Sequence, residues 1–291
     1  MITPELLAQV RRLTIRSRRA VEEVFSGAYR SAFRGKGLEF AEVREYVPGD
    51  DVRSIDWNVT ARHGRPFVKR FDEERELTVV VALDLSGSLR FGSRSRTKRD
   101  AAAEAGALVA LAASRNRDRV GLLLFTDRIE LYLPPSKSRS RSLRIVRELV
   151  AYEPKGTGTD LNGALAFLGR VLRRRAVLFL ISDWFADPFE RPLNLLARRH
   201  ELVAIEVEDP LEESIPERGL IHVRDLETGL TRLVDLRASG ARREWRTLKG
   251  RRQRALKETL LRARAERIRL RTDAPVAPEL VRHFEQRAYR R

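Results

Sequence analysis

The chain has 291 residues and no cysteine, so disulfides, thiolate metal sites and cysteine nucleophiles are excluded. Hydrophobic residues make up 42% of it, which excludes a disordered chain and suffices for one large domain or two small ones. The net charge of +17 has two possible explanations. The chain could bind nucleic acid or an anionic membrane, or it could simply have a solvated, arginine-rich surface.

Residues 1–76 are predicted to form an N-terminal extension with one amphipathic helix. Apolar residues recur near helical spacing over 4–25, with basic residues on the other face. Residues 26–76 are polar and irregular apart from a short strand at Val68–Phe71. The N-terminus lacks the order of a signal peptide, and every apolar run is far shorter than a membrane-spanning helix of about 20 residues, so we expect a cytoplasmic protein.

Residues 77–291 are predicted to form a doubly wound α/β domain, with a mostly parallel sheet flanked by helices. Leu77–Leu83 is a continuous, largely β-branched apolar run, typical of a strand buried on both faces. Strands and helices then alternate, as a doubly wound sheet requires. The predicted strands are 77–83, 120–125, 129–133, 176–182, 201–207 and 268–271, and the predicted helices are 97–114, 138–150, 161–173, 188–199 and 278–289.

An inserted hairpin and a long basic helix are predicted at about 211–266. The hairpin spans 219–235 with its turn at Glu227-Thr228-Gly229, and the helix spans 239–267. The basic stretch 242–271 is the best candidate for binding nucleic acid or an anionic surface. Failure to bind random DNA at low salt would exclude this alternative. We favour a solvated helix face with ion pairs such as Glu258–Arg262, because no aromatic residues interleave with the basic ones.

Three predicted loops carry small side chains with oxygen atoms. Residues 84–88 follow the first strand of the sheet, residues 156–160 precede a helix, and residues 182–183 end another buried strand. Sites in doubly wound domains lie at the carboxyl ends of the strands, so we expect these loops to meet. The predicted site residues are Asp84, Ser86, Ser88, Thr159 and Asp183.

Carboxylates and hydroxyls without histidine or cysteine favour Mg²⁺, Mn²⁺ or Ca²⁺ over zinc or copper. Simpler interpretations exist for each loop alone, namely a helix cap for residues 84–88 and a turn residue for Asp183. Asp160 is better explained as a helix cap than as a ligand. The three loops together, in this order, are more specific than any one of them.

The Asp84–Ser88 pentapeptide resembles the Asp-x-Ser-x-Ser motif of the metal-ion-dependent adhesion site, or MIDAS, of von Willebrand factor A domains. Thr159 and Asp183 stand where that family places its Thr and its second Asp, and Thr157 matches less well. The resemblance implies that the three hydroxyls bind a metal, that both Asp residues bind it directly or through water, and that an acidic residue of a partner fills the open position.

Residues 39–57 and 60–75 look like the signature of domain-of-unknown-function family 58, and this resemblance extends over nearly the whole chain. Members are commonly encoded beside MoxR-type AAA+ ATPases, which implies an adaptor or cochaperone role beside such an ATPase. Within the signature, three Asp residues (50, 51 and 56) lie among three Arg residues (44, 53 and 62), so we expect an ion-pair network rather than a partner surface. Trp57 is expected to be a packed anchor.

We therefore expect a metal-ion-dependent protein-interaction module and not an enzyme. A haloacid dehalogenase-type phosphatase needs a second Asp two residues after Asp84, and this chain has Ser86 there. The sequence has no Gly-x-x-x-x-Gly-Lys loop for nucleotide phosphates, and its four histidines form no recognisable catalytic pattern. No catalytic residue and no organic cofactor are expected.

Overall fold

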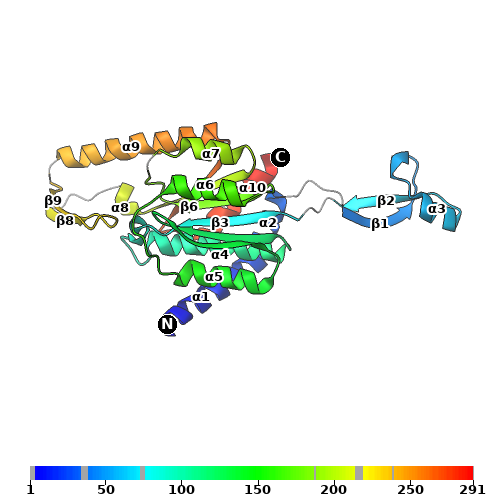
Figure 1. Cartoon of the computed structure of the whole chain (residues 1–291), viewed down its shortest axis with the longest axis horizontal. Coiled ribbons are helices and arrows are strands. Elements are labelled where there is room, and N and C mark those ends of the chain that lie inside the picture. The colour runs from blue at the N-terminus through cyan, green and yellow to red at the C-terminus, as the bar shows by residue number, and fades with distance from the viewer. Residues whose placement is uncertain are drawn as a thin grey trace.

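The main body of this computed structural model is a six-stranded sheet with helices on both faces (Figure 1). The structure describes residues 4–33, 39–72, 76–186, 188–213, 219–237 and 239–290. The strand order is β10-β7-β6-β3-β4-β5, and all neighbours are parallel except β4 and β5. The strands are β3 (Thr78–Asp84), β4 (Arg119–Phe125), β5 (Ile129–Ser136), β6 (Val177–Ser182), β7 (Glu201–Glu208) and β10 (Glu266–Arg271). The predicted doubly wound, mostly parallel sheet is confirmed.

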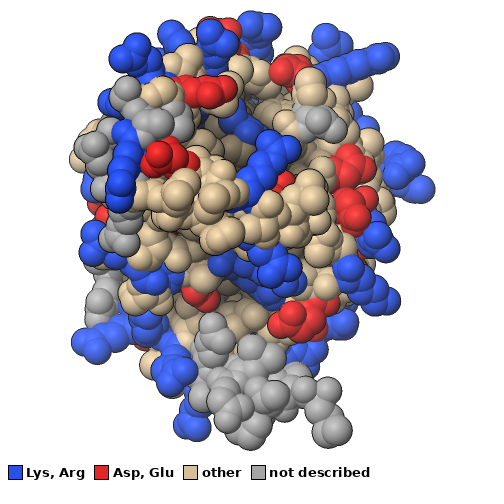
Figure 2. All heavy atoms as spheres, turned by 90° about the vertical axis from the view of Figure 1, so that its left-hand side faces the viewer, with Lys and Arg blue, Asp and Glu red and all other residues tan. Residues whose placement is uncertain are grey.

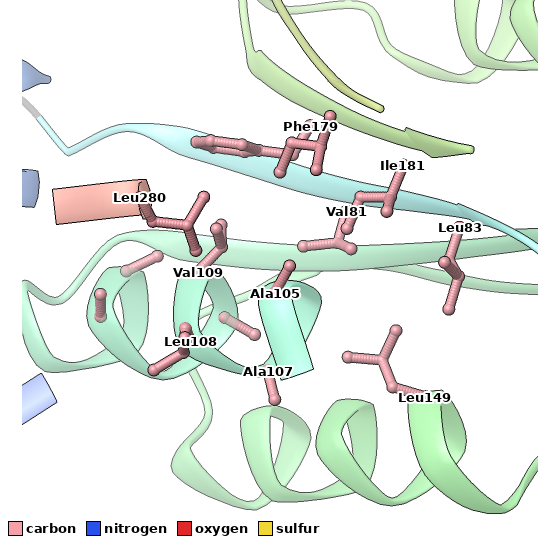
Figure 3. Close-up of a cluster of buried hydrophobic side chains, with 14 of the residues drawn as sticks. Val81, Leu83, Ala105, Ala107, Leu108, Val109, Leu149, Phe179, Ile181 and Leu280 are labelled. Atoms are coloured by element: carbon pink, nitrogen blue, oxygen red, sulfur yellow. The ribbon is translucent and has the colours of Figure 1, made fainter. Parts of the chain in front are cut away.

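The central strand β3 explains why the core has two sides. Side chains alternate along a strand, so Val81 and Leu83 face one layer of helices while Val80 and Ala82 face the other. Figure 3 shows the first side, where β3 and β6 pack on α4 and α5. Helices on that side are α4 (Lys98–Arg115), α5 (Arg139–Ala151) and α10 (Val276–Arg290), and those on the other side are α6 (Leu161–Val171), α7 (Glu190–Ala197) and α9 (Ser239–Arg262).

The N-terminal helix is longer than predicted and joins the core. It runs through α1 (Pro4–Ala20), a π-helical turn (Val21–Phe25) and α2 (Ser26–Ala32). Phe25, Tyr29 and Phe33 surround Phe284 of α10, with ring centroids 5.1–6.1 Å away. Residues 21–33 therefore share one hydrophobic core with the sheet, and the division of the chain at residue 76 stays a proposal.

The region predicted to be irregular contains an ordered hairpin, which lies apart from the main body (Figure 1). It consists of β1 (Glu39–Glu45), α3 (Trp57–His63) and β2 (Phe67–Asp72), with β1 antiparallel to β2. The β1 sequence is rich in charge, and a two-stranded ribbon needs no continuous apolar face. The periodicity that marks a half-buried strand is therefore missing from this segment.

The signature residues in this hairpin differ from expectation. Trp57 is 67% exposed, so its prediction as a packed anchor was wrong. Arg44 makes two hydrogen bonds to the carboxylate of Asp50, at 2.6 and 2.8 Å, which is one ion pair of the expected network. Asp51 and Asp56 instead accept hydrogen bonds from backbone amides and cap the short helices that follow them.

The segment predicted as an insertion forms a hairpin and a helix, and the helix is shorter than predicted. The hairpin comprises β8 (Leu220–Arg224) and β9 (Thr231–Asp235), and α8 (Pro210–Glu213) precedes it without having been predicted. Helix α9 ends at Arg262 rather than at residue 267, because Arg264 adopts a left-handed conformation with φ +53° and the chain turns into β10. Among the residues that the structure describes, no helix has the length and apolar character to cross a membrane.

Replacing Phe284 with alanine should lower the free energy of unfolding by about 3–5 kcal/mol, the usual cost of emptying a buried aromatic site. Phe284 is fully buried, whereas Tyr289 on the same helix is 92% exposed and gives a matched control. Urea denaturation of Phe284→Ala and Tyr289→Ala measures both. A loss below about 1 kcal/mol for Phe284→Ala would show that the N-terminal helices do not depend on this contact.

Candidate metal centre

The three predicted loops meet at the carboxyl edge of the sheet. Strands β3 and β6 are parallel neighbours, so Asp84 at the end of one lies beside the loop that holds Asp183 at the end of the other. The amide of Gly87 donates a hydrogen bond to the carbonyl of Thr157 at 2.7 Å, which joins the first loop to the second. The fold thus brings together the segments that the sequence separates by almost a hundred residues.

Asp84 is the most buried carboxylate of the site, with 0% exposure. One of its oxygens accepts the amide of Ser86 at 2.8 Å, and the other accepts the hydroxyl of Ser182 at 2.7 Å. Burial and the negative charge of Asp183 raise the pKa of Asp84 to about 7, against these hydrogen bonds. The ionised form of Asp84 is therefore unfavourable in this place, and a bound cation would stabilise it.

The three predicted hydroxyls point to a common place. The Oγ atoms of Ser86 and Ser88 lie 3.1 Å apart. Thr159 donates its hydroxyl to Oε1 of Glu227 at 2.9 Å, and the side chain of Ser88 lies close enough to this carboxylate to oppose the rise that burial causes in its pKa. Two of the three hydroxyls therefore converge on one carboxylate in the structure.

Asp183 has a cationic neighbour that the sequence did not reveal. Nζ of Lys98 lies 2.7 Å from Oδ2 of Asp183 and 2.7 Å from Oε1 of Glu212 on α8. Burial lowers the pKa of Lys98, but the two carboxylates outweigh burial and hold that pKa above its usual value. The other oxygen of Asp183 accepts the amide of Phe185 at 3.1 Å, so both oxygens have partners within the protein.

The site opens into a pocket of about 570 Å³. Arg252 of α9 stacks on the ring of Phe185, with its guanidinium carbon 3.5 Å from the ring centroid. Figure 2 views the molecule from this end, where basic and acidic side chains surround a hollowed surface. The pocket is lined by Ser88, Phe91, Lys98, Thr159, Asp183, Phe185, Ala186, Glu212, Asp225, Leu226, Glu227, Trp245 and Arg252.

A second carboxylate holds the loop that carries Thr159. Oε1 of Glu130 accepts the amides of Lys155 and Gly156 at 3.0 and 2.8 Å, and the hydroxyl of Thr126 at 2.8 Å. Burial raises the pKa of Glu130, but these hydrogen bonds prevail and lower it below its usual value. Asp160 caps α6 through the amide of Gly163 at 2.8 Å, as predicted.

The residues that sequence reasoning missed belong to other parts of the chain. Lys98 opens a helix directly after its N-cap Thr97, a position that usually faces solvent, and nothing in its neighbours signals burial. Glu227 lies in the predicted turn of the hairpin, where an acidic residue is unremarkable. Only the tertiary placement of the inserted segment 210–262 brings Glu212, Glu227 and Arg252 to this edge.

The oxygen atoms of the predicted site fit a hard divalent cation, provided that the hydroxyl oxygens also bind it. All the predicted side chains offer oxygen, which Mg²⁺, Mn²⁺ and Ca²⁺ prefer. Within the described part of the chain, no cluster of three or more His, Asp or Glu side chains is arranged to hold a metal. Asp84, Asp183 and the hydroxyls of Ser86, Ser88 and Thr159 are the groups on which binding would depend, and Lys98 already offsets part of the charge of Asp183.

Comparison with known proteins extends over most of the chain. The family model described as "Protein of unknown function DUF58" matches residues 42–256. An uncharacterized protein of Mycobacterium tuberculosis is 36% identical over 233 residues, which cover 79% of this chain and 73% of that protein.

Solved structures similar to this chain include two with low sequence identity. The conserved hypothetical protein BatB from Bacteroides thetaiotaomicron is 14% identical and has a TM-score of 0.48, with 73% of this chain and 99% of that chain covered. The VWA domain of SpRpn10 is 12% identical and has a TM-score of 0.43, with 72% and 95% covered. The strand order and site geometry described above do not depend on these likenesses.

Replacing Lys98 with methionine should destabilise the metal-free protein by about 3–5 kcal/mol, because two buried carboxylates lose their counter-charge. Lys257→Met, at an exposed position of α9, is the control and should change stability by less than about 0.5 kcal/mol. Urea denaturation in a chelating buffer measures both. If Lys98→Met were as stable as the control, the Lys98–Asp183 contact would not hold this loop.

The stability of the metal-free protein should fall as pH rises from about 4 to 7. Folded Asp84 keeps its proton to a pKa of about 7, whereas an unfolded Asp loses it near about 3.9, so the folded state binds more protons in this window. Asp84→Asn removes this dependence. The free energy of unfolding of Asp84→Asn, relative to wild type, should therefore increase between pH 5 and 8 by on the order of 2–4 kcal/mol. A constant difference across pH would contradict the assignment.

Proposed function

This chain belongs to the family described as "Protein of unknown function DUF58", and we propose that it is a metal-ion-dependent protein-interaction module. The observation that supports this most directly is the convergence of the oxygen-bearing loops at one edge of the sheet. Asp84, Ser86, Ser88, Thr159 and Asp183 would hold the cation, with Mg²⁺ preferred and Mn²⁺ or Ca²⁺ as alternatives. The cation, when bound, supplies positive charge and an open coordination position for a carboxylate.

The protein's own groups are suited to holding a ligand rather than to transferring atoms. Both oxygens of Asp84 accept hydrogen bonds, from Ser86 and Ser182. Both oxygens of Asp183 are engaged by Lys98 and by the amide of Phe185. Carboxylates fixed in this way cannot swing toward a substrate without breaking buried contacts. We therefore propose a binding role without catalysis.

The partner we propose is an acidic residue on a MoxR-type AAA+ ATPase, for which this protein would act as an adaptor or cochaperone. The acidic character follows from the proposed cation, whose open position would take a carboxylate, and Arg252 adds a positive charge to the pocket, whereas Lys98 is already paired with Asp183 and Glu212. The net charge of +17 would accelerate encounter with an acidic surface. The ATPase itself is proposed on the family resemblance.

A capture experiment tests this proposal. Immobilised wild-type protein is incubated with a purified MoxR-type ATPase of the same organism, in millimolar Mg²⁺ or in EDTA. We expect retention only with Mg²⁺, and at least a tenfold loss for Asp84→Asn. Asp273→Asn is the matched control, because Asp273 follows β10 at the same edge of the sheet but pairs with Arg271. Equal retention in EDTA would contradict metal dependence.

A further inference from the structure

The tip of the β8–β9 hairpin places a carboxylate in the candidate site. Oε1 of Glu227 accepts the hydroxyl of Thr159 at 2.9 Å, and the side chain of Ser88 lies close enough to the same carboxylate to oppose the rise that burial causes in its pKa. Ser88 and Thr159 come from two different loops, so the carboxylate lies where these loops meet. This is the position in which the proposed function requires an acidic side chain from outside.

The main chain of the tip is also recognised. The hydroxyl of Thr157 donates to the carbonyl of Glu227 at 3.1 Å. The carbonyl of Leu226 lies so close to Gly87 that a methyl group on this glycine would be 2.1 Å from the oxygen. A glycine at this point of the 84–88 loop therefore leaves room for the backbone of the tip. The body of the protein recognises both the side chain and the backbone at Leu226-Glu227.

The tip is preorganised by its own turn. Oδ1 of Asp225 accepts the amides of Glu227 and Thr228 at 2.8 and 3.1 Å, and Gly229 has φ +74°. These local contacts fix the direction of Glu227 without help from the body. A short peptide with this sequence retains the groups that build the turn.

The rest of the hairpin is weakly anchored. Leu220, Leu230 and Leu233 are 66%, 62% and 57% exposed, so these side chains bury little apolar area that would hold the hairpin in place. Segments with few buried apolar contacts open at low free-energy cost. The tip can therefore leave the site while the sheet and its helices stay folded.

We propose that Leu226-Glu227 is an internal copy of the partner's recognition element, which occupies the site in the resting protein and is displaced when a partner binds. This proposal rests on the proposed function and adds the chemistry of the partner. The partner presents an acidic side chain that directly follows an aliphatic residue, in a tight turn. Because the internal ligand is tethered, it competes at a high effective concentration and lowers the apparent affinity for any partner.

The test uses a labelled synthetic peptide with the sequence of residues 224–230, Arg-Asp-Leu-Glu-Thr-Gly-Leu. Its binding to the full chain in Mg²⁺ is measured by fluorescence anisotropy. Glu227→Gln should bind the peptide at least about tenfold more tightly than wild type, because the internal ligand is weakened. Glu285→Gln, an exposed site on α10, is matched in charge and should behave as wild type. A peptide with Gln in place of Glu should bind at least tenfold more weakly.

Equal affinity of wild type and Glu227→Gln, or no binding to Glu227→Gln, overturns the proposal. Amide hydrogen exchange over residues 225–231 gives a readout without any ligand: exchange should be faster in Glu227→Gln and unchanged in Glu285→Gln. Unchanged exchange in both variants would likewise overturn it.

Titration with Mn²⁺ alone, followed by electron paramagnetic resonance, separates this proposal from the proposed function. If wild type binds Mn²⁺ and Asp84→Asn does not, while the peptide fails to distinguish Glu227→Gln from wild type, the metal site stands and the internal ligand is overturned. If Mn²⁺ does not bind but the peptide still prefers Glu227→Gln, the internal ligand stands on the hydroxyls alone and metal dependence is overturned.

Discussion

Two buried carboxylates at the ends of neighbouring parallel strands determine which groups must surround them. The pairing of β3 with β6 brings Asp84 and Asp183 to the same edge of the sheet, where water is excluded and their charges repel each other. Charges in such a place need compensation. The surrounding structure supplies it through the ammonium of Lys98, the hydroxyl of Ser182 and the backbone amides that point into the loops.

This compensation is incomplete at Asp84 and more complete at Asp183. Lys98 contacts Asp183 and Glu212, whereas Asp84 receives only neutral hydrogen-bond donors among the contacts described, and its pKa is raised to about 7. A cation between Asp84 and the hydroxyls would remove that imbalance. The carboxylate of Glu227 adds negative charge on the open side, so a bound cation and the hairpin tip would stabilise each other. The same electrostatics thus connect metal binding, the inserted hairpin and the acidic partner.

The accuracy of the sequence-based predictions followed the strength of the local signal. Strand β3 was predicted within one residue at each end, because a strand buried on both faces is continuously apolar. Strand β1 and helix α3 were missed, because a two-stranded ribbon needs no continuous apolar face and its sequence shows no periodic pattern, and Trp57 is exposed where an aromatic residue suggested packing. The five residues of the predicted site were named from two short motifs and one strand end, since each loop follows or precedes a recognisable element, and their role as a metal site stays a prediction. Lys98 and Glu227 could not be named in this way, since Lys98 follows a helix N-cap, where a basic residue usually faces solvent, and Glu227 lies in a turn, where an acidic residue is common.

The sequence by itself determined the order of strands and helices, the absence of thiol chemistry and the oxygen-only character of the predicted ligands, because these follow from composition and from short-range periodicity. Only the tertiary structure decided which charges meet. Parallel strand pairing placed Asp84 beside Asp183, and the return of the inserted segment 210–262 over the carboxyl edge placed Glu212, Glu227 and Arg252 around them. Contacts between residues this far apart depend on how the whole sheet and its helices pack, and no local pattern in the chain encodes that information.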